Sequence, residues 1–201
     1  MALRDFFISL SENQTLSNAA GQYGLKLGAQ SVVAGTTIEE VIESIRKLNE
    51  QGISCTVDNL GEYVTDESEA TQAKEEILAM IEAIQVEELD AHISLKPSQL
   101  GLDIDIDFCY DNLYEIVERA HEYGIFVNFD MEDYKRLQPP FDILEELAKS
   151  FDNVGTVIQA YFHRAKDDIE NFKDYRLRVV KGAYKESEEV AYQDKLDIDI
   201  N

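Results

Sequence analysis

A long cation, a glycine and an aromatic residue follow one another at the end of an apolar stretch late in the sequence. Residues 178–184 read Arg-Val-Val-Lys-Gly-Ala-Tyr, so that Arg178 stands among β-forming residues and Gly182 then interrupts them. Glycine can adopt positive φ or let another group approach the main chain closely. A strand with charge at its carboxyl end and a glycine turn is typical of α/β enzymes that present catalytic groups there. An ordinary strand end whose cations reach solvent fits the same residues.

Charged side chains also follow two earlier apolar stretches. Lys96 ends the first, where a lysine could bind a carboxylate or form a Schiff base. Asp130 and Glu132 end the second, and the period-2 alternation of a strand places both on one face. A carboxylate buried at such a position requires a cation, for which the sequence offers Lys96, Arg178 and Lys181.

A further apolar stretch ends in a glutamine and a tyrosine, Gln159 and Tyr161. The amide of Gln159 could donate a hydrogen bond to one ring heteroatom and accept one from another. A solvent-facing amide on the outside of the sheet is the structural alternative for the same residue.

The sequence predicts no metal site and no phosphate-binding loop. His92, His121 and His163 lack the spacing of metal ligands and fit core or surface positions better. Residues 103–107 resemble the start of a calcium loop, but Phe108 stands at the sixth position, where such loops have glycine. The P-loop pattern and the G-x-S-x-G pattern are both missing from the sequence.

Composition limits the class of protein. The 201 residues have a hydrophobic fraction of 44% and a net charge of −23, which fits one folded domain and excludes a nucleic-acid-binding surface. Two distant cysteines, Cys55 and Cys109, suit a reducing cytosol. The apolar run at 6–10 is too short for a signal peptide, and no stretch approaches the roughly 18 apolar residues of a spanning helix. We therefore expect a cytoplasmic location.

These residues must be positioned by alternating strands and helices. Strands are expected at residues 53–57, 92–96, 125–129, 154–161 and 175–180. Helices are expected within residues 1–50, with one beginning after Thr36 and Thr37 and ending near Gly52, and then at 69–84, 112–123, 141–149 and 186–195.

Strand and helix alternation predicts an α/β fold with a parallel sheet. A dinucleotide-binding sheet should show G-x-G-x-x-G after its first strand, and residues 58–62, Asp-Asn-Leu-Gly-Glu, do not. Charged residues at successive strand ends instead favour a (β/α)8 TIM barrel. Only five strands are found, so we expect one domain, 1–201, with N-terminal helices at 1–52 and an incomplete barrel of about five βα units at 53–201.

Five short motifs, in this order, resemble proline dehydrogenase of the single-function bacterial type. They are Leu-Gly-Glu at 60–62, Lys-Pro-Ser-Gln-Leu-Gly at 96–101, Asp-Met-Glu at 130–132, Gln-Ala-Tyr at 159–161 and the stretch at 178–184. The resemblance covers essentially the whole chain, and its specificity lies in the ordered set. It implies a distorted (β/α)8 barrel that binds FAD and oxidises L-proline to Δ1-pyrroline-5-carboxylate. This is the first step of proline catabolism to glutamate.

The same resemblance implies a role for each matching residue. Lys96 is similar to the lysine that pairs with the substrate carboxylate, Asp130 to the active-site aspartate and Arg178 to the arginine beside the reactive edge of the flavin. Tyr184 is similar to an aromatic residue near the substrate. The residues that would contact the flavin are Met131, Gln159, Lys181, Gly182 and Ala183.

The resemblance also implies partners and a missing portion. The family passes electrons to a quinone, and its partners include pyrroline-5-carboxylate dehydrogenase, with at most peripheral association at the inner face of the plasma membrane. Its members continue with three more βα units, so we expect this chain to be the first five-eighths of such an enzyme. Two other hypotheses stay open. One is a barrel aldolase or lyase that uses Lys96 or Lys181 as a Schiff base, and the other is an inactive, truncated fragment that binds a partner through an open sheet edge.

Overall fold

The computed structural model describes residues 33–201, so the helices expected within the first 32 residues lie outside the described part. Helices and strands alternate along this part as the sequence predicts. They are α3 (Ile38–Asn49), β1 (Cys55–Asp58), α4 (Glu67–Val86), β2 (Ala91–Leu95), α5 (Ile106–Glu122), β3 (Val127–Phe129), α6 (Gln138–Leu147), β4 (Val154–Gln159), α7 (Ala165–Asn171), β5 (Arg176–Val180) and α8 (Lys195–Ile200).

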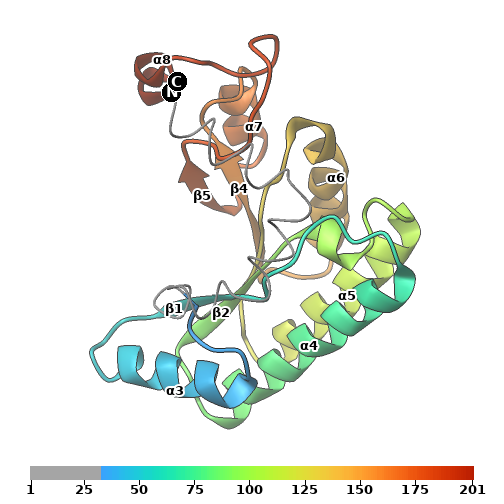
Figure 1. The fold of residues 1–201 in the computed structure, drawn as a ribbon, viewed down its shortest axis with the longest axis vertical. Coiled ribbons are helices and arrows are strands. Elements are labelled where there is room, and N and C mark those ends of the chain that lie inside the picture. Colours follow the sequence, from blue (N-terminus) through green and yellow to red (C-terminus); the bar gives the residue numbers. More distant parts are fainter. Residues whose placement is uncertain (1–32) are drawn as a thin grey trace, which may run out of the picture.

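The five strands form one parallel sheet in chain order, β1 to β5. Helices α4, α5 and α6 lie together on one side of these strands, and the sheet forms a curled half-barrel (Figure 1). This arrangement confirms the predicted α/β barrel class with about five βα units. Every residue of β4 is buried, as expected for a parallel strand that is covered on both faces.

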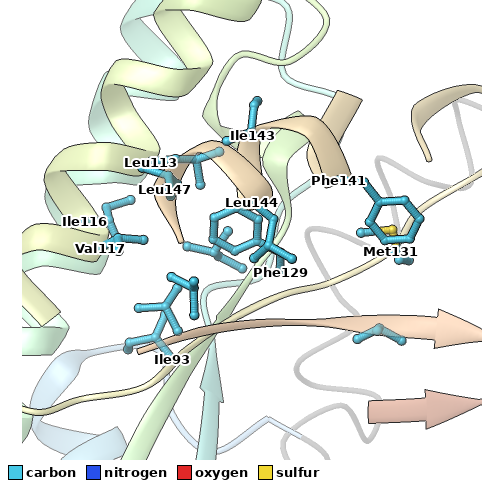
Figure 2. Close-up of a cluster of buried hydrophobic side chains, with 14 of the residues drawn as sticks. Ile93, Leu113, Ile116, Val117, Phe129, Met131, Phe141, Ile143, Leu144 and Leu147 are labelled. Carbon is cyan, nitrogen blue, oxygen red and sulfur yellow. The ribbon is translucent and has the colours of Figure 1, made fainter. Parts of the chain in front are cut away.

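The hydrophobic core lies between the helices and one face of the sheet. Ile93 of β2 and Phe129 of β3 meet side chains of α5 and α6 there (Figure 2). In-register partners such as Ile93 and Val127 share this face, so their chain neighbours Ser94 and Asn128 point to the opposite side. We call that opposite side the inner face of the sheet, and it includes Thr56, His92, Ser94, Asn128 and Arg178.

Met131, which the sequence analysis assigns to the flavin, is part of this core. Its side chain is only 6% exposed and lies beside Phe141 of α6 in Figure 2. A contact between Met131 and a cofactor on the inner face would therefore involve its main chain.

Aspartate side chains set the beginnings of two helices earlier than periodicity suggests. Asp66 accepts a hydrogen bond from the Ser68 amide and begins α4, while Asp105 accepts hydrogen bonds from the amides of Asp107 and Phe108 and begins α5. Such caps satisfy amides that have no partner inside the helix. The acidic run that imitates a calcium loop is therefore a helix start.

The prediction of a helix at 186–195 is wrong, and the sequence did not predict the short helix α7. Beyond one local turn, the main chain of this segment bonds the loop after β4: Tyr192 N donates to Tyr161 O at 2.7 Å and His163 N donates to Val190 O at 3.0 Å. Helix α8 begins only after Asp194, whose side chain accepts from the Leu196 amide. Pairing between distant segments has replaced the local helical pattern here.

None of the helices in residues 33–201 is long and apolar enough to cross a membrane.

Candidate functional site

Lys96 and Asp130, which directly follow the neighbouring strands β2 and β3, come together with Arg178 of β5. Asp130 Oδ1 lies 2.6 Å from Arg178 Nη2, and Asp130 Oδ2 lies 3.4 Å from Lys96 Nζ. Asp130 therefore stands between two cations, as the predicted pairing of this carboxylate requires. The roles assigned to these side chains remain predictions, but their proximity is a property of the fold.

The sheet positions Asp130 through its register. Ser94 and Asn128 are register partners on the inner face, and both bond Asp130 Oδ1: Ser94 Oγ at 2.8 Å and Asn128 Nδ2 at 2.9 Å. The Asp130 amide continues the ladder by donating to Leu95 O at 2.8 Å. The side chain is therefore fixed by neutral donors from two strands in addition to its cations.

Asp58 is a member of this cluster that the sequence analysis did not single out. It is the last residue of β1, and its Oδ2 accepts a hydrogen bond of 2.8 Å from Lys96 Nζ. Its Oδ1 is buried and has no hydrogen-bond partner among the described residues. The signal that could have found Asp58 is its position at a strand end, which it shares with Lys96 and Asp130.

Burial and charge act in opposite directions on this cluster. Burial raises the pKa of Asp58, and the hydrogen bond from Lys96 offsets only part of that effect. Burial would lower the pKa of Lys96, but its hydrogen bonds to Asp58 and Asp130 and their charges raise that pKa above its ordinary value. Lys96 is therefore a protonated ammonium held by two carboxyl groups.

Glu132 does not join the cationic cluster, although period-2 alternation placed it with Asp130. The strand ends at Phe129, so the alternation stops before Glu132. Its side chain is 1% exposed, and its carboxylate accepts from Ser98 N at 3.1 Å and from Ser98 Oγ. A buried carboxylate can be satisfied by neutral donors instead of a cation, and Glu132 is such a case.

The side chain of Gln159 is buried inside the protein, so the alternative of a solvent-facing amide is wrong. Its side chain is 3% exposed. The amide nitrogen donates to Glu132 O at 2.7 Å, and the amide oxygen accepts from Ala183 N at 3.3 Å. The glutamine thus connects the chain after β3 with the turn after β5.

The turn at 181–183 is held by the protein itself. Lys181 forms an ion pair with Asp199 of α8. Gly182 has φ +119°, and a Cβ at this position would lie 2.3 Å from the ring of Tyr161. The ring of Tyr161 therefore occupies the position that a Cβ of this residue would take.

Tyr184 extends the site toward the loop after β1. Its hydroxyl donates to Glu62 Oε2 at 3.1 Å, and burial raises the pKa of Tyr184 well above its ordinary value. Glu62 and Tyr184 both belong to motifs of the sequence analysis, and they are 122 positions apart.

A hollow of 260 Å³ lies on the inner face next to Arg178. His92 Nε2 lies 2.9 Å from Thr56 Oγ1 there, and the guanidinium of Arg176 stacks over the Phe126 ring at 4.4 Å. Burial lowers the pKa of His92, which favours the neutral imidazole. The residues that line the hollow are Thr56, His92, Phe126, Asn128, Arg176, Leu177 and Arg178.

The inner face offers a cofactor suitable donors at Arg178. The side chain of Arg178 is 55% exposed and bonds one carboxylate, so guanidinium N–H groups remain for a polar ring or an anion. Across residues 33–201, no group of three or more His, Cys, Asp or Glu side chains could hold a metal ion. The remaining donors of Arg178 could bind polar atoms of an organic cofactor.

Comparison with known proteins agrees with the motifs. The sequence model of the family described as proline dehydrogenase matches residues 41–201. Proline dehydrogenase 2 of Bacillus subtilis (strain 168) is 42% identical over 203 residues, which cover 100% of this chain and 67% of the relative. Proline dehydrogenase of Deinococcus radiodurans is 33% identical over 205 residues, covering 98% of this chain and 66% of the relative. The chain therefore spans about two thirds of the length of these relatives.

A solved structure shares the fold. Proline utilization A (PutA) from Bdellovibrio bacteriovorus, inactivated by N-propargylglycine, superposes with a TM-score of 0.79 at 22% identity. The match covers 92% of this chain and 24% of that one. The bifunctional protein PutA of Escherichia coli (strain K12) is 30% identical over 190 residues, covering 82% of this chain and 14% of the relative. The chain belongs to the proline dehydrogenase family.

Proposed function

We propose that this chain forms part of an oxidoreductase that oxidises L-proline to Δ1-pyrroline-5-carboxylate with FAD as its cofactor. The observation that carries the proposal is Asp130 held between Lys96 and Arg178 at the strand ends, in a chain of the proline dehydrogenase family. The domain proposed for this activity is the chain 1–201, with the five βα units at 53–201 and helices before them.

The cluster has the charges that a proline zwitterion requires. Lys96 has three N–H donors, of which Asp58 and Asp130 accept two, so one remains for the substrate carboxylate. The carboxylates of Asp58 and Asp130 offer the ring nitrogen of proline a negatively charged surrounding. Fixing both ends of the zwitterion would orient the carbon next to the ring nitrogen for oxidation.

Bound FAD would accept the two electrons, and the protein would contribute binding, orientation and electrostatics. Arg178 would stabilise negative charge at the reactive edge of the isoalloxazine ring. The other residues proposed to hold the cofactor are Met131, through its main chain, Gln159, Lys181, Gly182 and Ala183. Because Lys181, Gln159 and Ala183 already have protein partners, their part is to shape the wall of the site through those contacts.

A quinone is the proposed final electron acceptor, and pyrroline-5-carboxylate dehydrogenase is the proposed partner that consumes the product. Quinones dissolve in the bilayer, so the proposal places the protein in the cytoplasm with peripheral contact at the inner face of the plasma membrane.

The Schiff-base hypothesis is less well supported. A lysine nucleophile must be deprotonated, which enzymes achieve by lowering its pKa. The pKa of Lys96 is raised by its carboxylate partners, and Lys181 is paired with Asp199.

The test uses the full-length protein that contains these residues. We expect a flavin absorption spectrum on purification, bleached by L-proline without oxygen and restored by a water-soluble quinone. Borohydride with a carbonyl substrate should give no covalent adduct. A colourless protein that does not take up FAD, or an adduct on Lys96 or Lys181, would overturn the proposal.

A further inference from the structure

Buried and partly buried hydrogen bonds connect the loops that follow the strands, and Glu132 is the residue where they meet. From one direction, Tyr63 N donates to Ser98 Oγ at 2.8 Å, and Ser98 donates to the Glu132 carboxylate through both its amide and its hydroxyl. From the other direction, Ala183 N donates to Gln159 Oε1 at 3.3 Å and Gln159 Nε2 donates to Glu132 O at 2.7 Å. This chain of bonds, here called the Glu132 relay, joins the loops after β1, β2 and β3 to the end of β4 and the turn after β5.

The three central members of the Glu132 relay are shielded from water, whereas Ala183 at its end is exposed. Ser98, Glu132 and Gln159 are all buried. A buried polar group that loses its partner destabilises the fold, so each buried bond favours one relative placement of the loops. Water cannot replace a lost partner at these positions, and a shift of one loop is therefore transmitted to the next.

The relay connects the two halves of the proposed site. Ser98 lies two residues after Lys96, the proposed substrate-binding residue, on the turn Pro97–Leu100. Gln159 and Ala183 belong to the proposed cofactor-binding set. Glu132 contacts the first half with its carboxylate and the second half with its main-chain oxygen.

We propose that Glu132 is a positioning residue that fixes the distance between the substrate-binding loop at Lys96 and the cofactor-binding pair Gln159 and Ala183. The proposal rests on the proposed function for its kinetic consequence, because reaction rates fall steeply when two reactants are misplaced by about 1 Å. Its structural part, the coupling of Ser98 to Ala183 through Glu132, does not depend on the substrate or the cofactor.

The chemistry at Glu132 differs from that of a carboxylate that only holds the fold together. Asp168 of α7, which is also buried, is neutralised at 2.7 Å by Arg164, the residue directly before that helix. Glu132 instead accepts directed bonds from a distant loop and forms no ion pair with any residue of 33–201, and burial raises its pKa. Neutral donors such as those of Ser98 do not cancel the charge of a carboxylate, but their directed hydrogen bonds fix its position.

The first test compares two nearly isosteric variants of the full-length protein. Glu132→Gln keeps the volume but places an N–H group opposite one of the two Ser98 donors. The control, Thr156→Val, removes a buried side-chain bond between β4 and β3, Thr156 Oγ1 to Phe129 O at 3.1 Å, which is outside the relay. We expect Glu132→Gln to lower kcat for proline at least tenfold and Thr156→Val to change it less than twofold. Equal losses in both variants would overturn the proposal.

The second test needs neither substrate nor flavin. Amide hydrogen exchange in residues 181–184 should accelerate at least tenfold in Glu132→Gln and in Ser98→Ala, while exchange in α6 stays unchanged. Thr156→Val should leave residues 181–184 as in the wild type. Unchanged exchange at 181–184 in Glu132→Gln would refute the relay. If the variants show this accelerated exchange but the wild-type protein does not oxidise proline, the proposed function is refuted and the coupling stands.

Discussion

Arg178 Nη2 lies 2.6 Å from Asp130 Oδ1, although the two residues are 48 positions apart in the chain. This ion pair crosses β4, because Asp130 follows β3 and Arg178 lies in β5. The hydrogen bonds of Ser94 and Asn128 hold the Asp130 carboxylate in place, and the fixed carboxylate in turn orients the Arg178 guanidinium. The arginine that would act on the cofactor and the aspartate that would act beside the substrate are therefore parts of one arrangement.

Replacing Arg178 should lower turnover far more than it weakens proline binding. In the proposed function its charge acts on negative charge that develops during the reaction, and removing such a donor costs about 10²–10³ in kcat. We expect Arg178→Met to lose that factor in kcat with a change in KM of about threefold or less. Steady-state kinetics on the full-length protein measure both values. A variant that keeps kcat and loses only affinity would contradict this role.

Replacing Lys96 should mainly raise KM for proline. A hydrogen bond to a charged group contributes about 1.5–3 kcal/mol, which corresponds to roughly 10–150-fold in affinity. We expect Lys96→Met to raise KM by this amount with a smaller change in kcat. Arg178→Met is the matched comparison, since it removes the other cation that contacts Asp130. The assignment is wrong if the two variants show the same pattern.

Removing the charge of Asp58 should shift the alkaline limb of the kcat/KM profile to lower pH. Asp58 and Asp130 raise the pKa of Lys96, so Asp58→Asn lowers it. KM for proline should rise at alkaline pH as Lys96 loses its proton, and this rise should begin at a lower pH in Asp58→Asn than in the wild type. Profiles of kcat/KM against pH compare the two proteins, and an unshifted alkaline limb would show that Asp58 does not act on Lys96.

The buried carboxyl of Glu132 should give stability a defined pH dependence. Burial raises its pKa above the ordinary 4.5, so the folded state holds this proton more tightly than the unfolded state. Its contribution to stability is complete below pH 4.5 and is lost as the pH rises through the folded-state pKa. Relative to the wild type, Glu132→Gln should therefore gain free energy of unfolding as the pH rises from 4.5. Urea denaturation at several pH values measures this difference, and a constant or falling difference would contradict it.

Substituting Gly182 should destabilise the turn after β5 for two reasons. Its φ is +119°, and a Cβ would overlap the Tyr161 ring. Gly52 is the matched control, because it has φ +76° but no atom within 4 Å of the position of a Cβ. We expect Gly52→Ala to cost about 1 kcal/mol from backbone strain and Gly182→Ala to cost about 2–4 kcal/mol. Equal costs would mean that the Tyr161 ring moves away freely.

The sequence by itself determined the order of elements and the kind of side chain at each strand end. Apolar periods of 2 and about 3.6 residues depend on local geometry, so the five strands were expected within a few residues of their positions. The carboxyl ends of parallel strands meet at one edge, so Lys96 and Asp130 were expected at one site, with Arg178 as a candidate cation. The ordered motifs then predicted the family.

Only the tertiary structure decided which of these side chains are partners. Glu132 leaves the inner face because β3 ends at Phe129, and it bonds Ser98, 34 positions away. Gly182 adjoins the Tyr161 ring, and the chain at 186–195 pairs with the loop after β4 instead of forming a helix. Such pairings depend on strand register, on where each strand ends and on which polar groups are buried together. Register, strand ends and shared burial depend on segments that lie far apart in the chain, so the local periodicity of the sequence cannot predict them.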